Sequence, residues 1–196
     1  MIVLGYTFFG GDTDAHTAGV RLRDRMLRQL CGIETPCVRR LPAGKPVLDD
    51  RAEVTFSVSH TDNLAVCAVS FPGTADAGEF LVLDGSAASP EVGADAERIR
   101  TAEQAPRLRK IAARFFSPDA AARLTALPDS AVPRAFCEIW TAGESYVKMT
   151  GEGFGRGFSA LSFDGVKLPM LTLRRGEAEY IVRAAWREDR EQEERI

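Results

Sequence analysis

The sequence predicts an α+β fold built from two halves, and three observations support this. The 196 residues are 45% apolar and 27% charged, which is enough to form a normal buried core. Strand-like apolar runs and at least one long helical segment occur in each half. A stretch rich in Gly, Ala, Ser and Pro at residues 71–93 is typical of a boundary. We therefore place an N-terminal half at residues 1–80, a C-terminal half at 91–196, and residues 81–90 in the join.

Four segments make up the predicted N-terminal half. Residues 1–9 are apolar and predict a strand. Residues 13–32 have the pattern of a helix that ends at Gly32. Residues 54–60 alternate apolar and small polar side chains, and residues 64–70 are continuously apolar. The short turn between these two runs predicts a hairpin in or near the core.

The C-terminal half begins with an acidic strand, "GADAERI", at residues 93–99. Helical patterns follow, and Ser117 is placed to cap the second of them, with Pro118 at its first position. The later expected elements are helices at 102–116, 117–127 and 135–149, one strand from within 161–175, and one strand at 178–186.

Charge and cysteine content exclude some classes of function. The formal net charge of -3 gives no overall signal for binding nucleic acid or an anionic membrane. No run approaches the roughly 20 apolar residues of a membrane span, and the opening residues make a poor signal peptide, so we expect a cytoplasmic protein. Because no close pairs suggest a zinc site, buried free thiols are expected at Cys31, Cys37, Cys67 and Cys137.

Two pairs of charged residues stand out. In a strand, Asp95 and Glu97 share one face, where two carboxylates repel unless a proton or a cation lies between them. In a helix, Glu144 and Lys148 are neighbours, one turn after Trp140. Each pair has a plain alternative, a solvated strand face or a helix salt bridge. The same holds for three other residues, which fit a turn, a strand end and a helix start respectively: Ser59, His60 and His16.

The order of these patterns is more specific than any one of them. The series is "GKP" at 44–46, "FSVSHTDNLAVCAVS" at 56–70, "GADAERI" at 93–99, "RFFS" at 114–117 and "WTAGESYVKMTGEG" at 140–153. It resembles the 4'-phosphopantetheinyl transferases that activate peptide and polyketide synthases. The resemblance implies two similar α+β halves related by pseudo-twofold symmetry, an active site between them, and a monomer.

The resemblance also implies roles for single residues. The family's G-x-D-x-E motif falls on Gly93, Asp95 and Glu97, and its W-x-x-K-E-S-x-x-K motif on Trp140, Glu144, Ser145 and Lys148. A magnesium ion would be held by Asp95, Glu97 and Glu144. Coenzyme A would be bound by Lys45, Ser59, His60 and Lys148. Catalysis would rest on Glu144, which accepts the proton of the attacking serine, and on Lys148, which neutralises a pyrophosphate oxygen.

The implied reaction is that of a holo-acyl-carrier-protein synthase. The 4'-phosphopantetheine arm of coenzyme A passes to a serine of an apo acyl or peptidyl carrier protein, and 3',5'-ADP leaves. The alternative is a noncatalytic homologue that binds coenzyme A or a carrier protein. Gly143 stands where the family motif has lysine. Since glycine is a poor helix former, we expect alanine there to stabilise the helix, and lysine to raise stability and rate together.

Overall fold

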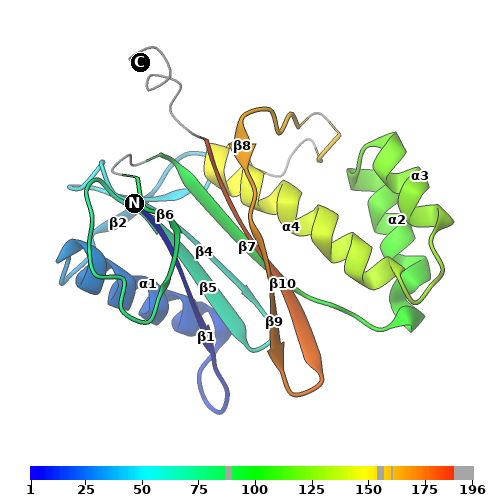
Figure 1. Ribbon diagram of the computed structural model, residues 1–196, viewed down its shortest axis with the longest axis horizontal. Helices are drawn as coiled ribbons and strands as arrows, with labels where there is room; N and C mark the ends of the chain where they lie inside the picture. Colours follow the sequence, from blue (N-terminus) through cyan, green and yellow to red (C-terminus); the bar gives the residue numbers. More distant parts are fainter. Residues whose placement is uncertain (87–89, 154–156, 160, 188–196) are drawn as a thin grey trace.

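Two antiparallel sheets share one apolar layer, and a long helix covers the outer face of each (Figure 1). The computed structural model describes residues 1–86, 90–153, 157–159 and 161–187. Its mixture of sheets and helices confirms the α+β class. Within the described residues, no helix is long and apolar enough to cross a membrane.

The N-terminal sheet has the strand order β4-β5-β1-β6. Strand β1 pairs with β5 along its whole length, with Leu4 opposite Ala68. Helix α1 packs on this sheet through the buried side chains Leu22, Met26 and Leu27. The elements of this half are β1 (Ile2–Phe8), α1 (Ala15–Cys31), β2 (Val38–Arg40), β3 (Pro46–Leu48), β4 (Thr55–Thr61), β5 (Leu64–Ser70) and β6 (Leu81–Asp84).

Helix α1 and the β4–β5 hairpin confirm the sequence expectations. The backbone N–H of Thr17 donates to the Asp14 side chain at 3.0 Å, and Gly32 closes the helix with φ of 67°. The sequence pattern missed three strands. β2 and β3 have three residues each, which is too short for an alternation to be visible. β6 lies in the expected join and pairs with β1.

The C-terminal sheet has the order β7-β10-β8, and β9 pairs with β10. Ser117 caps α3 as expected, its Oγ accepting from the N–H of Ala120 at 3.3 Å. The elements are β7 (Val92–Arg98), the 3-10 turn η1 (Ala102–Gln104), α2 (Ala105–Phe115), α3 (Pro118–Ala126), α4 (Val132–Thr150), β8 (Val166–Lys167), β9 (Met170–Arg175) and β10 (Ala178–Arg187).

The strand expected from within residues 161–175 begins later than the first apolar residues of that stretch. Gly165 has φ of 69°, a left-handed turn that places the preceding residues outside the sheet. Pro169 then separates the two-residue β8 from β9, because proline cannot donate to a strand ladder.

The two halves repeat one order of elements. In each, a first strand leads to a long helix and then to a hairpin, and the second hairpin strand pairs antiparallel with the first strand. These pairs are β1 with β5 and β7 with β10. The N-terminal half adds β2, β3 and β6, and the C-terminal half adds α2, α3 and β8.

Side chains from both halves fill the layer between the sheets. Leu4 and Val66 contribute from the N-terminal sheet, and Ala94, Ala96 and Val182 from the C-terminal sheet; all five are 3% exposed or less. The small residues Ala94 and Ala96 are therefore fully packed. This shared apolar layer holds the two halves together.

Polar contacts at the β4–β5 turn connect the halves at one end of this layer. Asp62 accepts from Arg98 at 2.7 Å and from Arg100 at 3.2 Å. Tyr180 donates its hydroxyl to Asn63 at 2.5 Å. Asp62 itself has φ of 45°, a left-handed conformation that is uncommon for a residue other than glycine.

The cysteine prediction is only partly correct. All four thiols are free, as expected. Cys67 and Cys137 are buried, and burial raises the pKa of each to about 12. Cys31, the last residue of α1, is half-buried, and Cys37, in the loop before β2, is exposed.

Candidate active site

Gly93 allows helix α4 to lie directly on strand β7. A Cβ atom at Gly93 would come within 1.9 Å of the Ser145 carbonyl oxygen and 2.5 Å of the Met149 amide nitrogen. No larger residue fits there without moving the helix backbone. The close approach brings the face of α4 that carries Glu144 and Lys148 over the face of β7 that carries Asp95.

A cavity of about 330 Å³ opens where β4, β7 and α4 meet. Trp140 and Val58 form its apolar wall. It gathers every predicted site residue except Lys45. These polar residues are Ser59, His60, Asp95, Glu97, Glu144 and Lys148.

Asp95, Ser59 and Lys148 form a closed triangle of hydrogen bonds. The Lys148 ammonium donates to Asp95 Oδ1 at 2.7 Å and to Ser59 Oγ at 3.0 Å. The Ser59 hydroxyl donates to the same Asp95 oxygen at 2.8 Å. The other carboxylate oxygen, Oδ2, is buried and has no hydrogen-bond partner among the described residues. One oxygen of Asp95 is therefore fully engaged and the other is left for a ligand.

Burial and mutual repulsion perturb the other two carboxyl groups. Burial, and then the Asp95 carboxylate, raise the pKa of Glu97 to about 7. The pKa of Glu144 is also raised by burial and by Asp95, while the Lys148 ammonium lowers it in part. Both groups therefore favour a proton, or a cation in its place.

The carboxylates suit a hard divalent cation in chemistry, but they are not yet gathered round one point. Among the described residues, no three His, Cys, Asp or Glu side chains stand close enough together to hold a metal ion. The buried, unpartnered Oδ2 of Asp95 and the raised pKa of Glu97 nevertheless mark a place where a further positive charge would be stabilised. Oxygen ligands of this kind are those that magnesium prefers.

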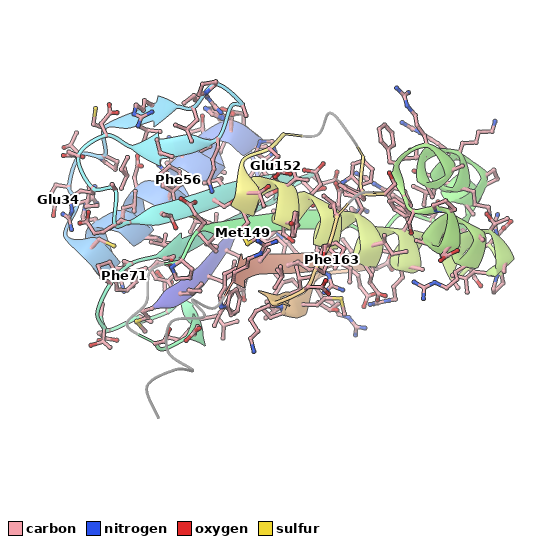
Figure 2. The ribbon with its side chains drawn as sticks, turned by 90° about the horizontal axis from the view of Figure 1, so that it is seen from above. Glu34, Phe56, Phe71, Met149, Glu152 and Phe163 are labelled. Carbon is pink, nitrogen blue, oxygen red and sulfur yellow. The ribbon has the colours of Figure 1, made fainter. Side chains whose placement is uncertain are left out.

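A second cavity of about 460 Å³ adjoins the first, and His60, Glu144 and Lys148 line both. Its size lies within the usual range for a small-molecule site. Seen from above, the C-terminal end of α4, marked by Met149 and Glu152, lies beside the N-terminal half (Figure 2). This cavity opens between that helix end and α1.

Lys45 lines this second cavity but is engaged at the end of α4. Its ammonium donates to the Met149 carbonyl oxygen and pairs with Glu91. A lysine there satisfies a carbonyl that the helix leaves free and complements the negative end of the helix dipole. The side chain is only 8% exposed, so the fold holds it in the cavity wall.

No sequence motif assigned a role in the site to His16 or Arg23. Both lie on α1 and line the larger cavity, with Val20 between them, at a spacing of four and then three residues. This spacing places the three residues on one face of a helix, which was a signal available in the sequence. Arg40 adds a further cation from β2.

Gly143 is not a vacant position on a helix surface, so the structure removes the basis of our expectation that alanine there stabilises the helix. A Cβ atom would lie 2.5 Å from two ring atoms of Phe158 and 2.6 Å from a third. The Phe158 ring is 7% exposed and packs edge-on against Trp140, with 5.3 Å between ring centroids. The backbone N–H of Phe158 donates to the Phe115 carbonyl oxygen at 2.7 Å. The Phe158 ring therefore fills the space that a side chain at 143 would need.

A known family matches the part of the chain that carries the acids and the lysine of this site. The family model described as the 4'-phosphopantetheinyl transferase superfamily matches residues 91–191, which is more than half of the chain. The chain belongs to this superfamily. The match covers Asp95, Glu97, Glu144 and Lys148.

Curated relatives support the same membership. The 4'-phosphopantetheinyl transferase HetI of Nostoc sp. is 33% identical over 116 residues, which are 58% of this chain and 40% of HetI. The 4'-phosphopantetheinyl transferase gsp of Aneurinibacillus migulanus is 30% identical over 115 residues, 59% of this chain and 38% of gsp. A putative 4'-phosphopantetheinyl transferase of Synechocystis sp. is 29% identical over 120 residues, 60% of this chain and 41% of that protein. The matched part of the chain spans about two fifths of the length of these relatives.

Proposed function

We propose that the protein transfers the 4'-phosphopantetheine arm of coenzyme A to a serine of an apo acyl or peptidyl carrier protein and releases 3',5'-ADP. The observation that carries this proposal is the shared wall of the two cavities. Glu144 and Lys148 border both the carboxylate-lined space and the larger, cation-lined space. Reacting phosphorus atoms at this border would lie within reach of both sets of side chains.

The larger cavity supplies the binding site for the nucleotide part of coenzyme A. Arg23, Arg40, His60 and Lys45 present positive or potentially positive groups to it, while Val20 and Phe56 supply apolar surface. Cations that complement phosphates, beside apolar walls that cover a base, suit a phosphorylated adenosine. We assign Lys45 and His60 to the phosphates of coenzyme A, as the family resemblance implies.

Asp95, Glu97 and Glu144 are the residues that would hold a magnesium ion, with Asp95 offering its unpartnered Oδ2. When bound, the ion would neutralise charge on the pyrophosphate as the phosphorus–oxygen bond breaks. Glu97 lies on β7 and Glu144 on α4. We expect both side chains to turn toward Asp95 when magnesium is bound.

The transfer needs a proton acceptor and charge neutralisation from the chain itself. The oxygen of the carrier serine attacks the phosphorus that bears the pantetheine arm, and the pyrophosphate linkage to 3',5'-ADP breaks. Glu144, in the cavity wall, accepts the serine proton. Lys148 uses two of its three hydrogens on Asp95 and Ser59, and the third is free to donate to a phosphate oxygen.

The repeated order of elements supports a pseudo-twofold relation between an N-terminal half at residues 1–80, whose sheet β6 extends from the join, and a C-terminal half at 91–196. We further propose that the protein acts as a cytoplasmic monomer. Its carrier partner would be an acidic helical domain, received by basic residues beside the larger cavity.

A mass-spectrometric assay tests the function directly. The protein is incubated with coenzyme A, magnesium and several apo carrier proteins, and the carrier mass is measured. We expect a phosphopantetheine adduct with the wild type and none with Glu144→Gln. Coenzyme A binding without an adduct on any carrier would instead support the noncatalytic alternative.

A further inference from the structure

The Ser59 hydroxyl has no hydrogen left for a phosphate. A serine carries a single O–H donor, and Ser59 directs it to Asp95 Oδ1 at 2.8 Å. The ammonium of Lys148 donates to the Ser59 oxygen at 3.0 Å, which fixes the hydroxyl from the other side. Since an ionised phosphate oxygen can only accept, it finds no donor at Ser59 while this triangle is closed.

Burial supports a fixed arrangement of this triangle. Ser59 is 7% exposed and Asp95 is 4% exposed, so water competes weakly for their hydrogen bonds. The three side chains come from β4, β7 and α4, and the contacts therefore cross from the N-terminal to the C-terminal half. The position of the N-terminal half is thereby coupled to the orientation of a single carboxylate.

The triangle also decides which oxygen of Asp95 is left as a free acceptor. Both donors bind Oδ1, and Oδ2 has no hydrogen-bond partner among the described residues. Rotation of the carboxylate would break two hydrogen bonds, one of them to a charged ammonium. The pair of donors therefore holds Oδ2 in one place.

We propose that Ser59 is a positioning residue for the Asp95 carboxylate and not a contact for coenzyme A phosphate. It orients Asp95 so that Oδ2 is presented to a divalent cation. This inference rests on the cation role proposed above for Asp95, and it replaces the phosphate role that the family resemblance implies for Ser59.

Ser57 provides a matched control on the same strand. It lies two residues earlier on the same face of β4, is 5% exposed, and also bonds across the halves, accepting from the Ala94 N–H at 2.9 Å. It does not bond to Asp95. Removing either hydroxyl costs a buried hydrogen bond between the halves, and only Ser59→Ala removes a donor from the carboxylate.

The test measures binding of manganese, as a probe for a divalent cation, without coenzyme A or carrier protein. Electron paramagnetic resonance titration gives the dissociation constant for the wild type, Ser59→Ala and Ser57→Ala. Loss of a partner that orients a metal ligand typically weakens the metal site about 10- to 100-fold. We expect a loss of that size for Ser59→Ala and a change within about twofold for Ser57→Ala.

Coenzyme A binding, measured by calorimetry in EDTA, separates the two roles of Ser59. We expect Ser59→Ala to bind coenzyme A as the wild type does. Weaker coenzyme A binding with unchanged manganese binding would overturn the inference, as would equal manganese losses in both variants. A wild type that transfers the arm but binds no manganese would refute the positioning role alone. A wild type that does neither would refute the proposed function as well.

Discussion

Replacing Gly143 with alanine should lower the melting temperature of the protein, although alanine is the better helix former. Gly143 lies inside α4, where the gain in helix propensity is up to about 1 kcal/mol. The new methyl group would meet the Phe158 ring at 2.5 Å, whereas ordinary contact begins at 3.4 Å. The ring must therefore move by roughly 0.9 Å. Because Phe158 also contacts Trp140, that movement disturbs the aromatic cluster beside the cavity.

Overpacking of this kind typically costs about 1–3 kcal/mol. Set against the propensity gain, the net loss for Gly143→Ala is about 1 kcal/mol. In a domain of this size, a loss of 1 kcal/mol lowers the melting temperature by about 2–4 °C. The Cβ atom of Gly143→Lys would meet the same ring, so that variant should lose stability too.

Thermal unfolding of four proteins measures the effect. These are the wild type, Gly143→Ala, Phe158→Ala and the double variant. Phe158→Ala alone should be strongly destabilising, by about 3–5 kcal/mol, because a buried ring is lost. In that background the methyl group at 143 no longer meets a ring, and alanine should raise the melting temperature. A higher melting temperature for Gly143→Ala in both backgrounds would show that Phe158 does not rest on Gly143.

Three further predictions concern the charged residues of the cavity. In EDTA, the free energy of unfolding should fall as pH rises from about 4.5 to about 7, because folded Glu97 holds its proton more tightly than the unfolded chain does. Glu97→Gln should remove this fall. The variant should then be more stable than the wild type at pH 8, by the order of 3 kcal/mol, and equal to it near pH 4. Denaturant unfolding at several pH values measures this, with Glu103→Gln as the exposed control, and a Glu97→Gln curve that follows the wild type as the control does would contradict it. Lys148→Ala should lower turnover more than it raises the Michaelis constant for coenzyme A. It should also destabilise the fold, because the Asp95 charge is left unpaired. Lys110→Ala, on the surface, should do neither. Asp95→Asn should abolish transfer and the gain in coenzyme A affinity that magnesium supplies, and full activity in that variant would exclude the three-carboxylate site.

Most of the longer helices and strands, but not β2, β3 and β6, could be predicted from the sequence because local rules act within single elements. Gly32 ends α1 in a left-handed conformation, and Ser117 caps α3, as their neighbours along the chain require. The alternation of residues 54–60 predicted the strand that now carries Ser59. The strand face shared by Asp95 and Glu97, and the helix face shared by Glu144 and Lys148, followed from the same periodicities.

Which of these faces meet was decided by the tertiary structure, because contacts between distant segments leave no period in the sequence. Gly93 was visible as part of a motif, yet its reason is a helix backbone that passes within 1.9 Å of where its side chain would begin. From the sequence, Gly143 was expected to weaken its helix. In the structure the ring of Phe158, 15 residues later along the chain, packs against it. Ser59 matched a phosphate-binding pattern, and only the packing of β4 beside β7 and α4 shows its single hydrogen committed to Asp95. Residue type and spacing determined the chemistry available to this chain, and the packing of its two halves determined which groups are free to use it.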